Sequence, residues 1–128
     1  MTQLFQTFSA DFVSGFKYTI YASLLALVFS LIIGTIMAIL QLSHNRIIRS
    51  LAKAYVAFFR NIPLLIIVMF FYVVAPMYFY SFDGFQAGTI GLTIYTSAFI
   101  AETVRSGIQT VPKGQMEAGL SSGFSYSE

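Results

Sequence analysis

The chain has 128 residues, of which 57% are hydrophobic and only 9% are charged. A soluble domain carries roughly 25% charged residues, so this composition excludes an ordinary soluble fold and favours an integral membrane protein. The net charge of +2 is too small to indicate a nucleic-acid partner, and the absence of cysteine excludes disulfides, thiol catalysis and thiolate metal sites.

The first 16 residues carry a regular pattern of large apolar side chains. These recur at helical spacing, at Leu4, Phe5, Phe8, Phe12 and Phe16. With Asp11 turned to water, the pattern predicts a short helix over residues 1–16 that lies in the membrane interface. A frayed tail is the alternative that the sequence leaves open.

Three stretches are long enough and poor enough in charge to cross a bilayer, which takes about 20 helical residues. They cover residues 18–42, 62–81 and 86–104. The second helix is expected to start near Pro63, because the missing proline N–H would be unpaired at a helix start in any case. Gly, Ser and Thr dilute the third stretch, which favours a position lined by protein rather than lipid. The sequence thus predicts an all-α membrane protein with three spans.

Basic residues are concentrated on one side of these predicted spans. Of the seven, four lie between the first and second spans, two follow the third span, and only Lys17 lies on the other side. Loops rich in Lys and Arg stay in the cytoplasm. We therefore expect a multi-pass protein of a cell membrane, with the N-terminus and the loop around Asp83 outside and residues after Arg105 inside.

Small residues form a stripe along the first predicted span. They stand four residues apart, at Ala22, Ala26, Ser30, Gly34 and Ala38. Lipid-facing surface gains nothing from small side chains, whereas another helix can approach closely over them. Gly84 and Gly88 repeat the spacing near the third span. All of these positions are predicted to pack against helices.

Two opposite charges lie near the inner end of the third span. Glu102 and Arg105 are three residues apart, so a helix places them on one face, where they can pair. Charges within a membrane indicate function by default, so a role in the substrate path or in a subunit contact is the alternative to a structural pair. The single His44 is expected to face cytoplasmic water. Neither a metal site nor a catalytic residue is predicted.

A short motif follows the third span, where residues 112–123 read PKGQMEAGLSSG. Pro112 and Gly123 predict the start and the end of a short cytoplasmic helix. The longer stretch AFIAETVRSGIQTVPKGQMEAGLSSG, residues 98–123, resembles the signature region of polar amino-acid ABC permeases. That region has A-E-x-V-R-x-G-I, then G-Q-x-E-A, then a Gly six residues after the Glu.

Two further segments fit the same family. RNIPLL at residues 60–65 resembles the R-G-T-P-L-L segment of these permeases, and Tyr18-Thr19 also matches. The chain departs from the pattern at Asn61 and Ile62, and at Gly119, where the family often has Ala. A helical Gly costs about 1 kcal/mol relative to Ala, so this departure would loosen the short helix slightly.

The resemblance implies that residues 105–128 form the coupling loop of a permease subunit. The loop residues that it singles out are Gly114, Gln115, Glu117, Ala118, Gly119 and Gly123. Glu117 would contact an ATPase subunit or hold the loop, and Gly123 would allow a sharp turn. The resemblance does not identify substrate-binding residues.

The same resemblance implies the partners of a bacterial importer for polar amino acids. They are a cytoplasmic ABC ATPase, a second copy of the permease or a homologous permease, and an extracellular or periplasmic amino-acid-binding protein. The sequence contains no G-x-x-x-x-G-K-[ST] motif. The chain is therefore expected to be a transporter subunit rather than an enzyme and to have no cofactor of its own, with ATP bound by its partner.

The end of the sequence indicates a partial permease domain over residues 1–128. Family permeases have five spanning helices, whereas three are predicted here. Ser125 and Glu128 form an S-x-x-E capping box, which would open a further helix. The alternatives are a small oligomeric membrane protein and a permease fragment without its own transport activity. An intramembrane enzyme is disfavoured, because no metal or nucleophile constellation is present.

Overall fold

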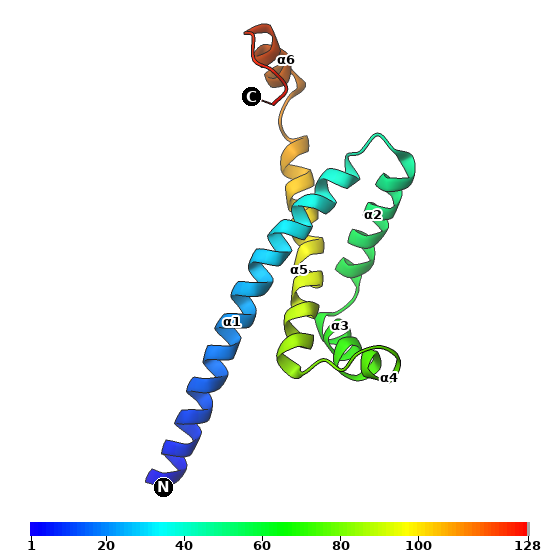
Figure 1. Ribbon diagram of the computed structural model, residues 1–128. Coiled ribbons are helices and arrows are strands. Elements are labelled where there is room, and N and C mark those ends of the chain that lie inside the picture. The colour runs from blue at the N-terminus through cyan, green and yellow to red at the C-terminus, as the bar shows by residue number, and fades with distance from the viewer. Residues whose placement is uncertain (128) are drawn as a thin grey trace.

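The computed structural model describes residues 1–127, and within them the regular structure is helical. The elements are α1 (Thr2–Gln41), α2 (Arg46–Asn61), α3 (Leu64–Met69), the π-helical segment η1 (Phe70–Val74), α4 (Ala75–Tyr78), α5 (Gly84–Gln109) and α6 (Lys113–Ser121). Figure 1 shows α1 as a long diagonal rod, with α5 along its C-terminal half and α2 returning beside it. The α3–α4 unit lies across the end of α2, and α6 stands alone beyond α5. The capping box expected at the end of the chain includes Glu128, which lies outside the described residues.

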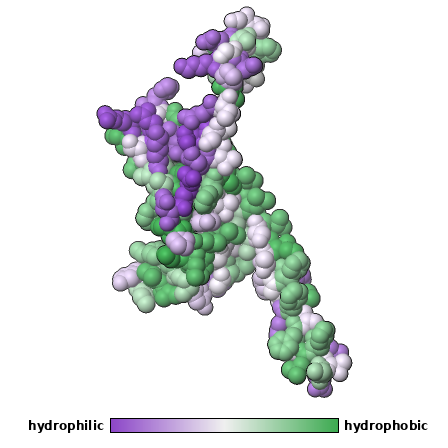
Figure 2. All heavy atoms as spheres, turned by 180° about the vertical axis from the view of Figure 1, so that it is seen from behind, coloured by the Kyte–Doolittle hydropathy of each residue, from purple (hydrophilic) through white to green (hydrophobic). Residues whose placement is uncertain are grey.

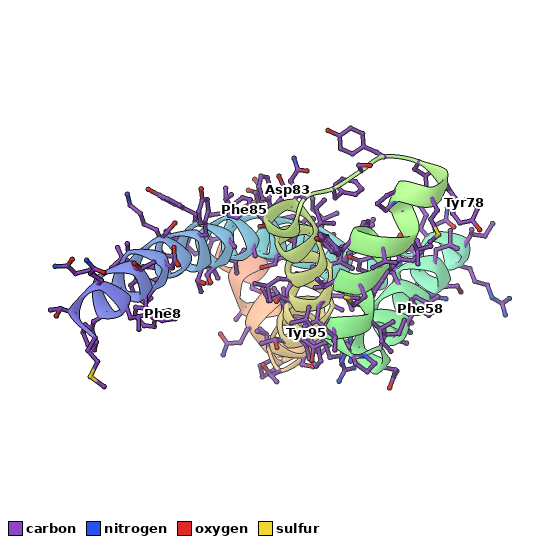
Figure 3. The ribbon with its side chains drawn as sticks, turned by 90° about the horizontal axis from the view of Figure 1, so that it is seen from below. Phe8, Phe58, Tyr78, Asp83, Phe85 and Tyr95 are labelled. Carbon is purple, nitrogen blue, oxygen red and sulfur yellow. The ribbon has the colours of Figure 1, made fainter. Side chains whose placement is uncertain are left out.

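Helix α1 runs without a break through 40 residues. At about 1.5 Å per residue it is roughly 60 Å long, about twice the hydrocarbon thickness of a bilayer. Its first part extends away from the other helices and carries Phe8 (Figure 3). The separate helix expected over residues 1–16 is therefore not seen. The segment contains no proline, and its one interior glycine, Gly15, leaves the helix intact, so nothing local interrupts it.

The second expected span, residues 62–81, begins at a sharp bend of the chain. Residues Arg46–Asn61 and Leu64–Tyr78 form two arms that meet at an angle of 102°. Pro63 disfavours the helical conformation at the preceding residue, and Ile62 is accordingly extended, with φ −101° and ψ 132°. The new helix begins directly after Pro63, as the sequence predicts.

The second arm is itself irregular, because η1 widens the helix between α3 and α4. Pro76 follows two residues later and has no N–H for the carbonyl of Tyr72, so the regular hydrogen-bond ladder cannot continue there. The arm ends at Tyr78, short of the expected boundary. Asp83 then begins α5 through a capping box: its carboxylate accepts from the Gln86 N–H at 2.7 Å, and the Gln86 side chain accepts from the Asp83 N–H.

Among the described residues, α1 alone is a single helix long enough and apolar enough to cross a membrane. The bent pair formed by residues 46–61 and 64–78 meets the same criterion when taken together. Helix α5 has 26 residues, enough to span, but its Gly, Ser and Thr leave it less apolar. Among the described residues, length and apolar composition thus select one helix, or two with the bent pair, where the sequence predicts three spans.

The core is built from small residues, and large apolar side chains face outward. The buried hydrophobic residues among those described are Ala26, Ala38, Ala52, Val56, Ile67, Ala75, Ala87, Ala98 and Ala101. Leu24, Leu27 and Phe29 are exposed, as are most large apolar residues of the chain. Soluble proteins have the opposite arrangement, whereas close helix packing over small residues inside a lipid solvent produces this one.

Candidate functional site

Helix α6 stands apart from the rest of the molecule (Figure 1) and packs against none of the other described helices. It begins after Pro112 and ends at Ser121. Gly123 has φ 93°, a left-handed conformation that favours glycine. The Gly123 N–H donates to the Leu120 carbonyl at 3.2 Å and the Phe124 N–H to the Gly119 carbonyl at 3.1 Å. These two bonds form a Schellman cap, so this helix end is defined locally.

The side chains of α6 are exposed almost throughout. Gln115, Glu117 and Ala118 face solvent, and Gly119 is half-buried. A Cβ atom added at Gly114 or Gly119 would meet no heavy atom within 4 Å. Each helical glycine lowers helix stability by roughly 0.5–1 kcal/mol relative to alanine. No internal contact in the described chain therefore accounts for these two glycines.

Apolar surface also gathers around α6. A hollow of about 540 Å³ lies between the end of α5 and α6 and includes Val111, Met116 and Leu120 in its lining. Met116 and Phe124 are each more than half exposed. Exposed apolar side chains beside a polar helix face are typical of a surface that a partner covers.

Glu102 and Arg105 form an ion pair on α5, close to where α6 follows. The Arg105 Nε donates to the Glu102 carboxylate at 3.2 Å, and its Nη1 donates to the Gln109 side chain at 2.8 Å. Both charged side chains are about one-quarter exposed. The three side chains form a ladder along one face of the helix.

The small-residue stripe of α1 lies against α5. Ala26, Ser30, Gly34 and Ala38 are buried, and Ala22 is half-buried. A Cβ atom at Gly34 would lie 2.7 Å from the Cγ2 atom of Ile100 and 2.9 Å from the Ser97 carbonyl oxygen. The close approach of α1 and α5 therefore requires glycine at this position.

Gly84 and Gly88 lie at a different kind of contact. A Cβ atom at either would meet nothing within 4 Å, and both line a hollow of about 480 Å³ beside Ala22. Phe85 packs edge-on against Tyr18 across this hollow, at 6.0 Å between ring centroids. Asp83 and Phe85 mark this end of α5 in Figure 3. Gly84 and Gly88 thus lie where α5 faces α1, but the two helices are not in close contact there.

A family comparison connects these features. Residues 30–128 match the model of the family described as "binding-protein-dependent transport system inner membrane component". The chain belongs to this family. The match includes the small-residue stripe from Ser30 onward, the ion pair and the whole of α6.

Relatives in this family have been named as amino-acid permeases. The chain is 51% identical over 125 residues to the probable glutamine ABC transporter permease protein GlnM of Bacillus subtilis, covering 98% of this chain and 57% of that protein. It is 36% identical over 107 residues to the putative glutamine transport system permease protein GlnP of Rickettsia prowazekii, covering 83% of this chain and 49% of that protein. The chain thus spans about half the length of these relatives.

A solved structure shares the arrangement of the helices. The crystal structure of an amino acid ABC transporter with histidines superposes with a TM-score of 0.83 and 30% sequence identity. The match covers 94% of this chain and 56% of that chain. The all-α permease fold expected from the sequence is therefore confirmed, as is membership of the amino-acid ABC permease family.

Several contacts in this permease chain were missed by sequence reasoning. Gly91 faces Val68, whose Cγ2 would lie 2.7 Å from an added Cβ. The Tyr55 hydroxyl contacts the Ser97 hydroxyl at 2.9 Å and joins α2 to α5. Gln41 is buried at the end of α1. Polar or very small residues within otherwise apolar stretches were the signal from which these contacts could have been predicted.

Among residues 1–127, no group of His, Cys, Asp or Glu could hold a metal ion.

Proposed function

We infer that this chain is part of the membrane-spanning permease subunit of an ATP-driven importer for polar amino acids. In this proposal α6 is the coupling helix, which docks on a separate cytoplasmic ATPase and transmits its movements to the translocation pathway. The chain works beside a second permease copy or a homologous permease and receives substrate from an extracellular or periplasmic binding protein. Two relatives carry glutamine in their names, so glutamine is the first substrate to test.

The observation that carries this proposal is that α6 is exposed and packs against none of the other described helices. Its Gly114 and Gly119 lower helix propensity although no described residue crowds them. Glycines on two sides of the helix would let its backbone sit close to the walls of a groove on another protein. The apolar side chains Met116 and Leu120 then contribute buried area, and Glu117 contributes a charge at the rim of the contact.

Orientation follows from the basic residues around the same end of the molecule. Figure 2 shows hydrophilic side chains gathered towards the α6 end, while the opposite part of α1 is mainly apolar. We place this hydrophilic end in the cytoplasm, where loops rich in Lys and Arg reside. The N-terminus is then outside, and α6 is on the side where an ATPase can reach it.

The coupling role is tested by co-purification. The tagged permease chain is co-expressed with an amino-acid ABC ATPase subunit, extracted from membranes and captured, and the bound ATPase is quantified. Glu117→Lys reverses a charge at the docking helix and is expected to reduce ATPase recovery about tenfold, as for a loss of about 1.4 kcal/mol in a contact. Asp11→Lys makes the same charge change at the far end of α1 and should leave recovery unchanged. Equal recovery with both variants would count against the coupling role.

A further inference from the structure

A polar cleft lies between α1, α2 and α5, away from α6. It has a volume of about 250 Å³ and is lined by Gln41, Lys53, Val56, Ala57, Arg60, Glu102 and Arg105. Helices α1 and α5 bring Gln41 and Glu102 to it, and α2 supplies the basic residues. Most of its polar groups are hydrogen-bond donors, which suits an anion.

Gln41 is the unusual member of this cleft. The residue is only 4% exposed, and its Nε2 atom has no hydrogen-bond partner among the described residues. Buried polar atoms in native proteins are nearly always satisfied, by protein or by ordered water. An amide nitrogen can only donate, so its partner is an acceptor, and in a positively charged cleft an oxygen of an anionic ligand fits that place.

The charge of the cleft comes from a stripe along α2, which we call the basic stripe. Its members fall three, four and seven residues apart, so they share one helix face: Arg46, Arg49, Lys53 and Arg60. Within residues 1–127 none of these four forms an ion pair, and the cleft carboxylate of Glu102 is already paired with Arg105. The cleft therefore keeps an uncompensated positive charge. Hydrophilic residues extend from the α6 end down into the apolar body in Figure 2.

A second face of α2 is apolar and exposed. Ile47, Leu51 and Phe58 are 72%, 67% and 59% exposed, and they lie four and seven residues apart along the helix. At about 100° per residue, this face lies on the side of α2 opposite the basic stripe, so α2 can meet lipid on one side while its charges face the cleft on the other. A free phosphate ion would use only the cleft, whereas a phospholipid bound there would also keep its acyl chains in the surrounding bilayer.

We propose that this cleft binds the phosphate group of an anionic phospholipid, with Gln41 Nε2 donating to a phosphate oxygen and Lys53 and Arg60 supplying the charge. Basic pockets between membrane helices on the cytoplasmic side recognise anionic headgroups in this way. The acyl chains stay in the bilayer around the helices, outside the cleft. This proposal does not depend on the transport role of α6.

The test measures which lipid stays bound. The purified chain is reconstituted in phosphatidylcholine vesicles containing phosphatidylglycerol and extracted in mild detergent, and retained lipid is identified by native mass spectrometry. Phosphatidylglycerol should be retained in preference to phosphatidylcholine. Gln41→Leu removes the donor without changing charge and should lower retention about tenfold, as for a hydrogen bond to a charged group. Lys53→Ala should lower it about fivefold.

Two controls separate binding in the cleft from diffuse attraction to the basic end of the molecule. Lys113→Ala removes the same charge at the same end but outside the cleft, and should retain lipid like the unmodified chain. Lys53 is exposed, so its variant should fold normally even if Gln41→Leu does not, and circular dichroism checks this. Equal loss in the Lys53 and Lys113 variants would overturn the proposal, since attraction would then be diffuse. Binding of inorganic phosphate without retention of phosphatidylglycerol would also overturn it, in favour of a free-anion site.

Discussion

Gly34 of α1 lies so close to Ile100 of α5 that an added Cβ atom would stand 2.7 Å from the Ile100 Cγ2 atom. Such separations essentially never occur between real Cβ atoms and their neighbours. Gly34→Ala must therefore push α1 away from α5, and we expect it to lower the free energy of unfolding by about 1–3 kcal/mol. Thermal unfolding of the purified chain in detergent measures this loss.

The matched control for this change lies in the same helix. A Cβ atom at Gly15 would meet nothing within 4 Å. Gly15→Ala should leave the unfolding temperature unchanged or raise it, because alanine favours the helix by up to about 1 kcal/mol. If both variants lost stability equally, close α1–α5 packing would not be the cause.

Tyr55→Phe tests the polar link between α2 and α5. The Ser97 hydroxyl donates to the Ile94 carbonyl at 2.7 Å, so the Tyr55 hydroxyl is the donor in its 2.9 Å contact with Ser97. Removing that hydroxyl should lower stability by about 0.6–1.7 kcal/mol, the range typical of hydrogen bonds between membrane helices. Thermal unfolding again provides the measurement. Tyr21→Phe alters an exposed tyrosine of α1 and should have no effect; an equal loss in both would contradict the assignment.

Sequence reasoning predicted best where a local rule acts. The four-residue spacing of small residues placed Ala26 and Ser30 on one face of α1, and both are buried there. Pro112 and Gly123 predicted the two ends of α6, because proline favours a helix start and a left-handed glycine ends a helix. These features depend on one or a few neighbouring residues, so the sequence contains them directly.

The missed features depend on contacts between distant segments. The 102° bend at Pro63 and the widened turn before Pro76 were not predicted, because proline allows several backbone solutions and packing selects one. Gly88 and Gly91 cannot be told apart by their neighbours in the sequence. Only at Gly91, of these two, would an added Cβ atom approach another backbone, that of Val68. The buried amide of Gln41 arises only once three helices converge.

The pair formed by Glu102 and Arg105 can be measured by a double-mutant cycle. Glu102→Gln, Arg105→Gln and the double variant remove the charges singly and together. Both side chains are about one-quarter exposed, so solvent screens the pair, and we expect a coupling energy of about 0.5–1 kcal/mol that falls at high salt. Unfolding free energies in detergent at low and high salt give this value. Strictly additive effects would show that the pair contributes nothing to stability.

The proposed orientation is testable because the chain contains no cysteine. Ser9, Ser81 and Ser122 are all exposed, and each can be replaced singly by cysteine with little change in size. On intact cells, a membrane-impermeant maleimide should label Ser9→Cys and Ser81→Cys, because the segments around them lie outside. Ser122→Cys follows α6 and should react only after the membrane is permeabilised, since the six basic residues from Arg46 to Lys113 hold that side in the cytoplasm. Labelling of Ser122→Cys in intact cells, with Ser81→Cys protected, would reverse the topology and place α6 out of reach of any cytoplasmic ATPase.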